Sequence, residues 1–467
     1  MPEIRCATAL ALAAFALGCR LAEPEQPPDI VLITIDTLRA DHLGAYGYDR
    51  PTSPALDRLA REGVLFENAH SPSSWTRPAV ASLFTSLWPS EHGATAFERP
   101  LRAGVATLAE LLRNAGYRTV GVSGNFVHVS EPAGLARGFD DWFALSKATR
   151  GEGNAIFTDA DPAGTPVYRR APDAPELNAA VLERVPPAGD APLFLYVHYM
   201  DPHSAYSPPS EHRARLARDP GYRADEFASS SLLKSLARGE VELSDRDRRW
   251  LIDLYDAEIA SVDAAIEELL EALAARGYGS DSVICVVSDH GEEFGEHGGW
   301  FHGISLHAES LRVPLILRDP RSGRRGERRE EPVDLIDVAT TLLRRAGVEP
   351  TAGMRGRDLL SANLAPRDLV AELHHDPPFE ENVAPREQRL AVLRWPWKTI
   401  RSRTSAAANY RVDHDPHETR PLDAALPADL VAHTERLASH LDALEDVSPQ
   451  RLDAETLEGL RALGYAD

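Results

Sequence analysis

The chain has 467 residues, of which 43% are hydrophobic and 26% are charged, an ordinary composition for a globular protein. Its formal net charge of -22 argues against nucleic acid as a partner, because binding to a phosphate backbone needs basic patches. A chain of this length can bury a large core and could hold two or three domains, although large α/β enzymes often form a single unit.

The first residues are typical of a bacterial export signal and are not expected to belong to the fold. Arg5 is followed by an apolar run over residues 7–17 that is too short to span a bilayer. The run leads into Cys19 in a pattern that resembles the lipobox of bacterial lipoproteins. We therefore expect residues 1–19 to be a signal peptide ending at Cys19, and residues 20–28 to be a tether. The protein would then be exported and lipid-anchored to the cell envelope, in the periplasm or at the outer membrane, with plain secretion as the alternative.

Strand-like and helical segments alternate through most of the remaining chain, which predicts an α/β fold with a largely parallel sheet covered by helices. In chain order the predicted elements are a strand over 29–36, helices over 53–62 and 105–114, strands over 118–123 and 193–200, a helix over 256–276, strands over 283–288 and 313–317, and a helix over 333–346.

The alternation is interrupted once and stops near residue 370. The segment 204–249 carries many charges with weak periodicity, and it predicts a helical insertion that is either a lid or a solvated excursion without a role. Beyond residue 370 the pattern favours antiparallel strands over 390–401 and 409–413, then a closing helix over 427–444. We therefore expect a catalytic domain over 29–370 and a C-terminal subdomain over 371–467.

Chemistry-bearing side chains follow two of the predicted apolar strands. Asp36 ends the first strand, and Asp289 and His290 follow the strand 283–288, where open α/β sheets place their sites. An adjacent acid and imidazole can ligate one ion if the backbone turns, and Gly291 permits such a turn. Thr76 lies in a turn before a helix, so this is the layout of a hydroxyl nucleophile activated by a metal ion.

Four stretches of the sequence resemble motifs of the sulfatase family, within the alkaline phosphatase superfamily. They are residues 36–44, residues 83–93, residues 288–298 with 309–314, and residues 409–422. The resemblance covers the chain from about residue 29 to its end, apart from the insertion. It implies an ester hydrolase with a large, mostly parallel sheet sandwiched by helices and a small C-terminal antiparallel sheet.

Three departures from the family pattern bear on the chemistry. Thr76 stands where sulfatases have a Cys or Ser that is oxidised to formylglycine, and oxidation of Thr would give a ketone instead of an aldehyde. Thr37 stands where many sulfatases have an acidic ligand, and His290 where some have Asn. The imidazole favours Zn²⁺ or Mn²⁺, with Ca²⁺ or Mg²⁺ as alternatives.

The resemblance and the residues together predict a divalent metal ion held by Asp36, Thr76, Asp289 and His290. Thr at the nucleophile position resembles the family's phosphodiesterases and phosphoryl-group transferases. We therefore expect a metal-dependent hydrolase or transferase that cleaves phosphate esters, diesters above all, through a covalent Thr76 intermediate. The alternatives are a sulfuric or phosphonic ester hydrolase without formylglycine, and a non-catalytic binding module that retains the fold.

Other side chains are expected at the site with less defined roles. His203 resembles the family's substrate-facing His, and His302 stands where sulfatases often have a Lys that contacts the transferred group. With Asp201 these two histidines could form a second metal site, or they could bind the substrate and protonate its leaving group. Asn125 is expected to bind a phosphoryl oxygen or to serve as a turn amide. The expected partner is an anionic ester, such as a lipid head group, a glycan or a nucleotide-like molecule, and the sequence does not indicate the oligomeric state.

Overall fold

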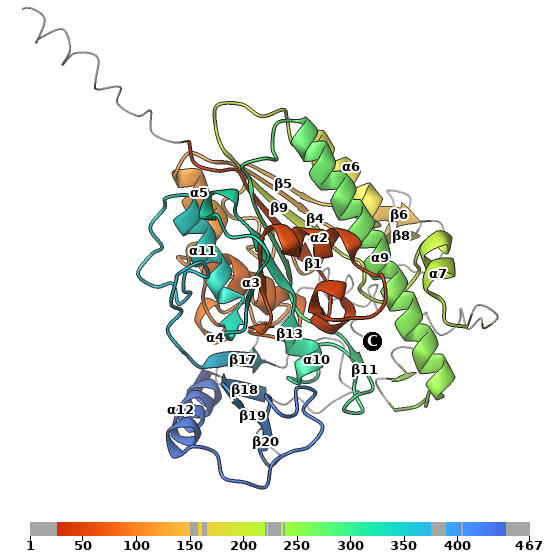
Figure 1. The fold of residues 1–467 in the computed structure, drawn as a ribbon, viewed down its shortest axis with the longest axis vertical. Coiled ribbons are helices and arrows are strands. Elements are labelled where there is room, and N and C mark those ends of the chain that lie inside the picture. Colours follow the sequence, from red (N-terminus) through yellow and green to blue (C-terminus); the bar gives the residue numbers. More distant parts are fainter. Residues whose placement is uncertain are drawn as a thin grey trace, which may run out of the picture.

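The computed structural model of the chain describes residues 26–149, 157–160, 166–219, 222, 235–236, 239–374, 389–402 and 405–444. The expected signal peptide, Cys19 and most of the tether lie outside the described residues. Figure 1 shows a large sheet between helices, with a smaller subdomain formed by the C-terminal part of the chain at one end. Within the part of the chain that the structure describes, no helix is long and apolar enough to cross a membrane.

Among the described residues, the main sheet has eight strands in the order β15-β2-β14-β10-β1-β9-β4-β5. Its strands are β1 (Ile30–Ile35), β2 (Val64–Phe66), β4 (Arg118–Ser123), β5 (Asp141–Ala144), β9 (Leu193–Tyr199), β10 (Val283–Ser288), β14 (Leu315–Arg318) and β15 (Glu327–Arg329). The run from β10 to β5 is parallel, whereas β14 is antiparallel to both of its neighbours. The expected mostly parallel sheet is confirmed.

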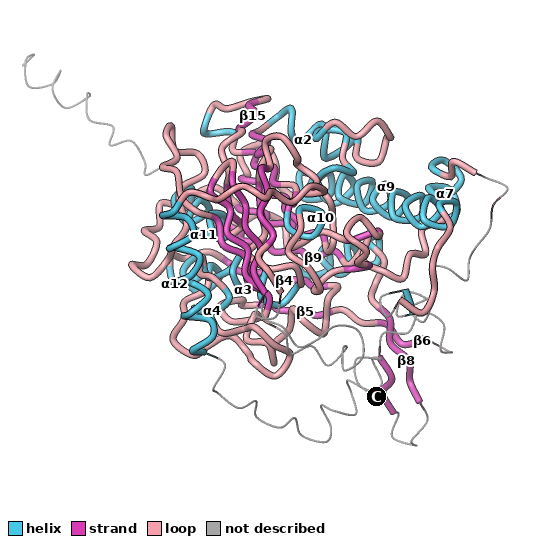
Figure 2. The backbone as a smooth tube through the Cα atoms, turned by 90° about the horizontal axis from the view of Figure 1, so that it is seen from below, coloured by secondary structure: helices cyan, strands magenta, loops and turns pink. Residues whose placement is uncertain are grey.

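Helices cover both faces of this sheet, as Figure 2 shows from the end of the strands. The helices are α2 (Pro54–Glu62), α3 (Thr76–Thr85), α4 (Pro89–His92), α5 (Leu108–Asn114), α6 (Ala174–Arg184), α7 (Ser210–Leu216), α9 (Asp245–Ala275), α10 (Ala308–Leu311), α11 (Ile336–Arg345) and α12 (Ala428–Leu444), with short 3-10 turns at Ala40–His42, Gly44–Tyr46 and Pro320–Ser322. Val31, Ile33 and Ile35 of β1 pack in one core with α2, α6 and α9. Ile30 and Leu32 pack in the other core with α3, α5 and α11. Because both faces of the parallel strands are covered, β1, β9 and β10 are buried along their whole length.

In the part of the C-terminal subdomain that the structure describes, a four-stranded antiparallel sheet has α12 packed beside it. Its strands are β17 (Leu369–Leu373), β18 (Arg389–Arg394), β19 (Trp397–Ser402) and β20 (Ala408–Arg411). The expected small antiparallel sheet is therefore confirmed. The expected single strand over 390–401 is instead a hairpin, because Pro396 lacks the N–H that a continuous strand would use.

Smaller sheets carry the loops around the strand ends. They are β11 (Glu293–Phe294) with β12 (Trp300–Phe301), then β13 (Arg312–Val313), β3 (Ala69–His70) and β16 (Val333–Asp334), and finally β6 (Lys147–Thr149), β8 (Pro166–Arg170) and β7 (Phe157–Ala160). Two predicted elements are divided by these sheets. The strand 313–317 is interrupted at Pro314, and the helix 333–346 opens as β16 and becomes helical at Ile336.

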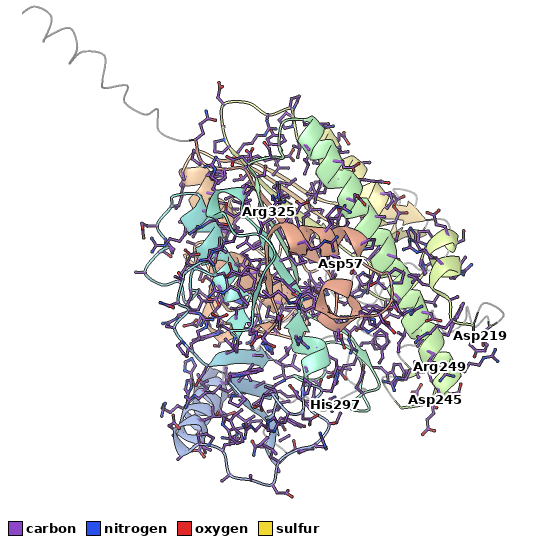
Figure 3. The ribbon with its side chains drawn as sticks, in the orientation of Figure 1. Asp57, Asp219, Asp245, Arg249, His297 and Arg325 are labelled. Atoms are coloured by element: carbon purple, nitrogen blue, oxygen red, sulfur yellow. The ribbon has the colours of Figure 1, made fainter. Side chains whose placement is uncertain are left out.

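The long helix α9 begins at Asp245, well before the predicted start at 256. The Ser244 hydroxyl oxygen accepts a hydrogen bond from the Asp247 backbone N–H, and the Asp247 carboxylate accepts one from the Ser244 backbone N–H, a reciprocal cap that starts the helix. Figure 3 labels Asp245 and Arg249 at this end of α9, where Arg246 pairs with Asp219 from the chain after α7. Part of the expected insertion is therefore the first turns of α9.

Candidate active site

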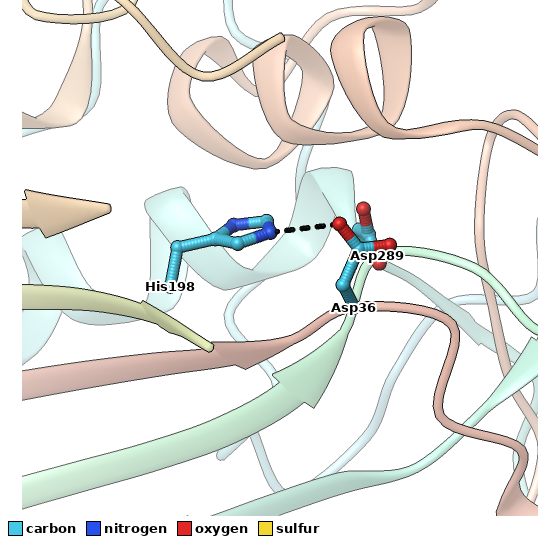
Figure 4. Close-up of side chains that lie close together, drawn as sticks. All are labelled: Asp36, His198 and Asp289. Atoms are coloured by element: carbon cyan, nitrogen blue, oxygen red, sulfur yellow. Dashed lines mark hydrogen bonds and ion pairs between the residues drawn. The ribbon is translucent and has the colours of Figure 1, made fainter. Parts of the chain in front are cut away.

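The candidate site lies at the carboxyl ends of three adjacent parallel strands. Asp36 follows β1 and Asp289 follows β10, and the two strands are paired up to Ile35 and Ser288. β9 pairs with the other side of β1 and carries His198 near its end. The three side chains have no exposed surface, and their ligand atoms lie within 4.8 Å of one another (Figure 4). The sequence predicted the two acids, but it did not single out His198, whose signal was a polar residue inside an apolar strand.

Two buried carboxylate oxygens converge on one imidazole nitrogen. Asp36 Oδ1 and Asp289 Oδ2 have no hydrogen-bond partner among the described residues. They lie 3.6 Å and 3.5 Å from His290 Nε2, and Thr76 Oγ1 lies 3.3 Å from the same nitrogen. A buried oxygen of this kind is costly unless a cation or a donor satisfies it. This donor set therefore fits a divalent metal ion.

The state of His290 suits it to be a metal ligand. Its Nδ1 lies 2.9 Å from the carbonyl oxygen of Gly291, which can only accept, so Nδ1 carries the proton and Nε2 keeps its lone pair. Burial and the neighbouring His302 lower the pKa of His290 to about 3, so the ring is neutral. Burial and the charge of Asp36 raise the pKa of Asp289, the response expected of two carboxylates that share a site without a cation. The structure brings the four predicted ligands together, and their binding of metal stays a prediction.

Thr76 begins α3, and its hydroxyl faces the two acids. Its Oγ1 lies 3.5 Å from Asp36 Oδ2, and the residue is 2% exposed. The preceding Trp75 is extended, and the carbonyl of Ser74 accepts a hydrogen bond from the N–H of Gly303. A hydroxyl at the start of a ten-residue helix lies near the positive end of the helix dipole, which favours a negatively charged oxygen.

His302 is held against the site by a carboxylate that the sequence did not single out. Its Nδ1 lies 2.9 Å from Glu292 Oε1, and Tyr206 donates its hydroxyl proton to Glu292 Oε2 at 3.2 Å. The ring lies 4.5 Å from His290 and 4.9 Å from His203, measured between ring centroids. Burial alone would lower the pKa of His302, but the Glu292 carboxylate outweighs it and the pKa is raised. With Nδ1 donating to Glu292, Nε2 is the atom left for a substrate.

His203 reaches the site, whereas Asp201 does not join it. His203 Nδ1 lies 2.6 Å from the Ser204 carbonyl oxygen and therefore donates, which leaves Nε2 available. Asp201 Oδ2 accepts a hydrogen bond from the backbone N–H of Ala174, the first residue of α6, at 2.9 Å. The N-terminal N–H groups of α6 thus attract this carboxylate. Among the described residues, Asp201, His203 and His302 do not form a group within metal-binding reach. The second metal site suggested for these three residues is not assembled.

Asn125 faces Asp36 and belongs to a turn at the same time. Its Nδ2 donates to Asp36 Oδ2 at 2.9 Å, and its Oδ1 accepts from the backbone N–H of His128 at 3.0 Å. The structure therefore shows Asn125 as a turn amide, and its expected contact with a phosphoryl oxygen stays a prediction.

His128 is a further buried imidazole that the sequence did not single out. Its ring packs edge-on against Trp75 at 5.7 Å, and burial lowers its pKa.

Comparison with known proteins gives consistent matches along most of the chain. Residues 28–348 match the model of the Sulfatase family, and residues 295–425 match a family described as N-sulphoglucosamine sulphohydrolase, C-terminal. The chain is 24% identical over 418 residues to an N-acetylglucosamine-6-O-sulfatase of Bacteroides thetaiotaomicron, covering 75% of this chain and 74% of that protein. It is 26% identical over 415 residues to the multifunctional alkaline phosphatase superfamily protein PehA of Trinickia caryophylli, covering 76% and 80%. The crystal structure of a phosphonate monoester hydrolase of Agrobacterium radiobacter superposes with a TM-score of 0.67 at 20% identity, covering 89% and 95%.

Proposed function

The chain belongs to the sulfatase family of ester hydrolases, and on that premise we propose that it cleaves phosphate esters, diesters above all, through a covalent intermediate on Thr76. The observation that carries this proposal is the place of the Thr76 hydroxyl. It lies 3.3 Å from His290 Nε2 and 3.5 Å from Asp36 Oδ2, at the start of α3. A Thr at this position can attack as an alcohol, but its oxidation product would be a ketone and not the aldehyde of formylglycine.

Asp36, Asp289, His290 and Thr76 are the residues that would hold a divalent ion. When bound, such an ion would lower the pKa of the Thr76 hydroxyl and balance negative charge on the transferred group. Two carboxylates with one imidazole favour Zn²⁺ or Mn²⁺ over Ca²⁺, because imidazole is a good ligand for the first two ions and hard cations prefer oxygen.

The residues of the site divide the reaction between them. Thr76 Oγ1 loses its proton to solvent water and attacks phosphorus, while Asp36 Oδ2 orients the hydroxyl. The bond from phosphorus to the leaving oxygen breaks, and His302 Nε2 donates a proton to that oxygen while Glu292 holds Nδ1. Attack by water, or by an acceptor alcohol, on the phospho-threonine then frees Thr76.

A second candidate function is hydrolysis of sulfuric or phosphonic esters by the same hydroxyl. The comparisons support it, because one relative is an N-acetylglucosamine-6-O-sulfatase and one structural neighbour of this chain is a phosphonate monoester hydrolase. The Thr at position 76 speaks against a formylglycine mechanism for either ester, but it does not exclude direct attack.

A panel of esters that share one leaving group separates these candidates. Bis-p-nitrophenyl phosphate, p-nitrophenyl phosphate, a p-nitrophenyl phosphonate and p-nitrophenyl sulfate are compared by kcat/KM with the metal-loaded protein. We expect the diester to be turned over fastest and the phosphoryl group to be found on Thr76 by mass spectrometry after acid quenching. Fastest turnover of the sulfate would replace the proposal with the second candidate. Binding without turnover of any ester would indicate a non-catalytic module.

We also propose that the protein is exported and carries lipid on Cys19. The support is the apolar run that leads to this cysteine. Cells that express the full chain or its Cys19→Ala variant are fed a tagged fatty acid and fractionated. Label and membrane association should disappear in the variant, and an unlabelled protein in the soluble fraction of wild-type cells would contradict the proposal. A place in the envelope would bring lipid head groups and glycans within reach as substrates.

A further inference from the structure

The two carboxylate oxygens of Asp36 have opposite environments. Oδ2 is surrounded by donors: Asn125 Nδ2 at 2.9 Å, His198 Nε2 at 3.2 Å and Thr76 Oγ1 at 3.5 Å. Oδ1 has no donor among the described residues and lies 3.6 Å from His290 Nε2. Since the whole residue is buried, this asymmetry comes from the protein and not from solvent. The protein binds Oδ2, and Oδ1 remains free to face the candidate ion site.

The hydrogen bonds of His198 assign its tautomer. A carboxylate can only accept, so His198 Nε2 must carry the proton that it shares with Asp36. The other nitrogen, Nδ1, lies 2.9 Å from the hydroxyl of Tyr196, which therefore donates to it. Both ring nitrogens are then occupied, and neither presents a lone pair to a metal ion. His198 lies close enough to Asp36 and Asp289 to be counted with them, but these two hydrogen bonds use both of its ring nitrogens.

The strand holds His198 and Tyr196 rigidly. The two residues are separated by one position in β9, so their side chains lie on the same face of the sheet. The backbone of His198 pairs with Thr34 of β1 on one side and with Ser123 of β4 on the other. Its carbonyl oxygen accepts from the N–H of Gly124, where an added Cβ would come within 3.2 Å of that oxygen. Three strands therefore fix the backbone that carries the imidazole, and the Tyr196 hydroxyl holds the ring.

We propose that His198 is a positioning residue that holds Asp36 as a one-oxygen ligand and thereby biases the site toward small ions such as Zn²⁺ over Ca²⁺. The inference rests on the metal site of the proposed function. Ca²⁺ takes six to eight oxygen ligands and commonly uses both oxygens of a carboxylate, whereas Zn²⁺ is satisfied by four ligands at about 2.0–2.2 Å. A donor fixed on Oδ2 withholds the second oxygen, and so it lowers the affinity for the larger ion relative to the smaller one.

The test compares the affinities of full-length variants for Zn²⁺ and Ca²⁺, measured by competition with a chromogenic chelator. We expect His198→Leu to weaken Zn²⁺ binding by about 10- to 100-fold, the usual effect of losing a partner of a metal ligand, with unchanged stoichiometry. The ratio of Zn²⁺ to Ca²⁺ affinity should fall. His198→Gln should recover most of both quantities, because its amide nitrogen can donate to Oδ2 as Nε2 does. Tyr196→Phe keeps the packing of the aromatic ring. It should lower the Zn²⁺ affinity and the ratio of Zn²⁺ to Ca²⁺ affinity as His198→Leu does, but by less.

His92→Gln is the matched control. His92 is equally buried, but it contacts Ser82 Oγ and the carbonyl oxygen of Pro78 in α3 and has no hydrogen bond or ion pair with Asp36. It should leave both affinities unchanged.

Three outcomes would overturn the inference. Unaltered affinities in His198→Leu would show that the site does not depend on the contact between His198 and Asp36. If that variant does not fold, unaltered affinities in Tyr196→Phe would show the same. A loss in His198→Gln as large as in His198→Leu, with Tyr196→Phe unaffected, would make His198 a ligand. If the wild-type protein binds neither ion, the metal site of the proposed function fails as well, whereas wild-type binding with unaltered variants removes only the role of His198.

Discussion

At the first position of α3, Thr76 offers the site its hydroxyl while contributing little to the core that surrounds the helix. Thr76→Ala removes the nucleophile, and we expect kcat to fall by about 10³-fold or more on every ester that the enzyme accepts. Thr76→Ser keeps a hydroxyl and should retain part of the activity. Steady-state kinetics, with circular dichroism and metal content as controls, checks this. Parental turnover by Thr76→Ala would remove the nucleophile assignment.

The pairing of His302 with Glu292 makes a prediction about leaving groups. If His302 donates a proton to the departing oxygen, His302→Gln should lower kcat by about 10²- to 10⁴-fold for an alkyl ester. It should change kcat much less for a nitrophenyl ester, whose leaving group needs no proton. Kinetics on the two esters tests the difference, and Glu292→Gln should show the same pattern in weaker form. An equal loss on both esters would mean that His302 only positions the substrate.

Between elements, one buried ion pair joins β19 to the turn that follows β20. Lys398 Nζ lies 2.6 Å from Glu418 Oε1, and the two side chains are 2% and 1% exposed. Lys398→Met would leave the Glu418 charge buried and uncompensated, so we expect the free energy of unfolding to fall by about 3–5 kcal/mol. The double variant Lys398→Met/Glu418→Leu should recover much of that loss. Urea unfolding measures both, and a double variant as unstable as the sum of the single variants would contradict the explanation.

The loop between β12 and β11 is attached to the same turn through His297, which Figure 3 labels near the C-terminal subdomain. His297 Nδ1 lies 2.5 Å from Glu309 Oε1, and Nε2 lies 2.9 Å from the carbonyl oxygen of Glu418. The hydrogen bond to Glu309 raises the pKa of His297 from 6.5 to about 9.

The folded protein therefore binds this proton more tightly than the unfolded chain does. The stabilisation is present in full below pH 6.5 and is lost as the pH rises through about 9. As the pH rises across this window, the melting temperature of the wild type should fall, and the melting temperature of His297→Gln should fall less. Parallel curves for the two proteins would show that His297 is not the group responsible.

For the whole molecule, the unpartnered oxygens Asp36 Oδ1 and Asp289 Oδ2 predict that a metal ion contributes to folding as well as to catalysis. Asp36 and Asp289 are buried together, so removal of a cation leaves two acids that repel each other. We expect chelation to abolish activity and lower the melting temperature, and Zn²⁺ or Mn²⁺ to restore both better than Ca²⁺. An ion at a concentration of 100 Kd adds about 2.7 kcal/mol to the free energy of unfolding.

Asp289→Asn is the control for this prediction. It should raise the melting temperature of the metal-free protein, because it relieves the repulsion, and it should abolish the shift caused by metal. Full activity of the chelated wild type would contradict the metal requirement, and recovery with Ca²⁺ alone would contradict the expected preference for Zn²⁺ or Mn²⁺.

The sequence by itself determined the family and the fold class, and it singled out two acids, Asp36 and Asp289, that the structure places together. The apolar run that ends at Ser288 is recognisable without tertiary information, so β10 lies where it was predicted. Parallel strands end at one edge of a sheet, so Asp36 and Asp289 had to be close. Boundaries set by local caps were less accurate, because the start of α9 at Asp245 lies in a charged segment without clear periodicity.

Tertiary structure alone decided how the side chains around those acids are used. Sequence spacing cannot show that His198 contacts Asp36 from the neighbouring strand, or that Glu292 orients His302. Sequence spacing also cannot show that the Asp201 carboxylate points to the first turn of α6. The N–H group that it binds belongs to Ala174, which is distant in sequence. Strand order and helix packing bring these partners together, and each partner's hydrogen-bonding capacity then decides which atoms remain for an ion or a substrate.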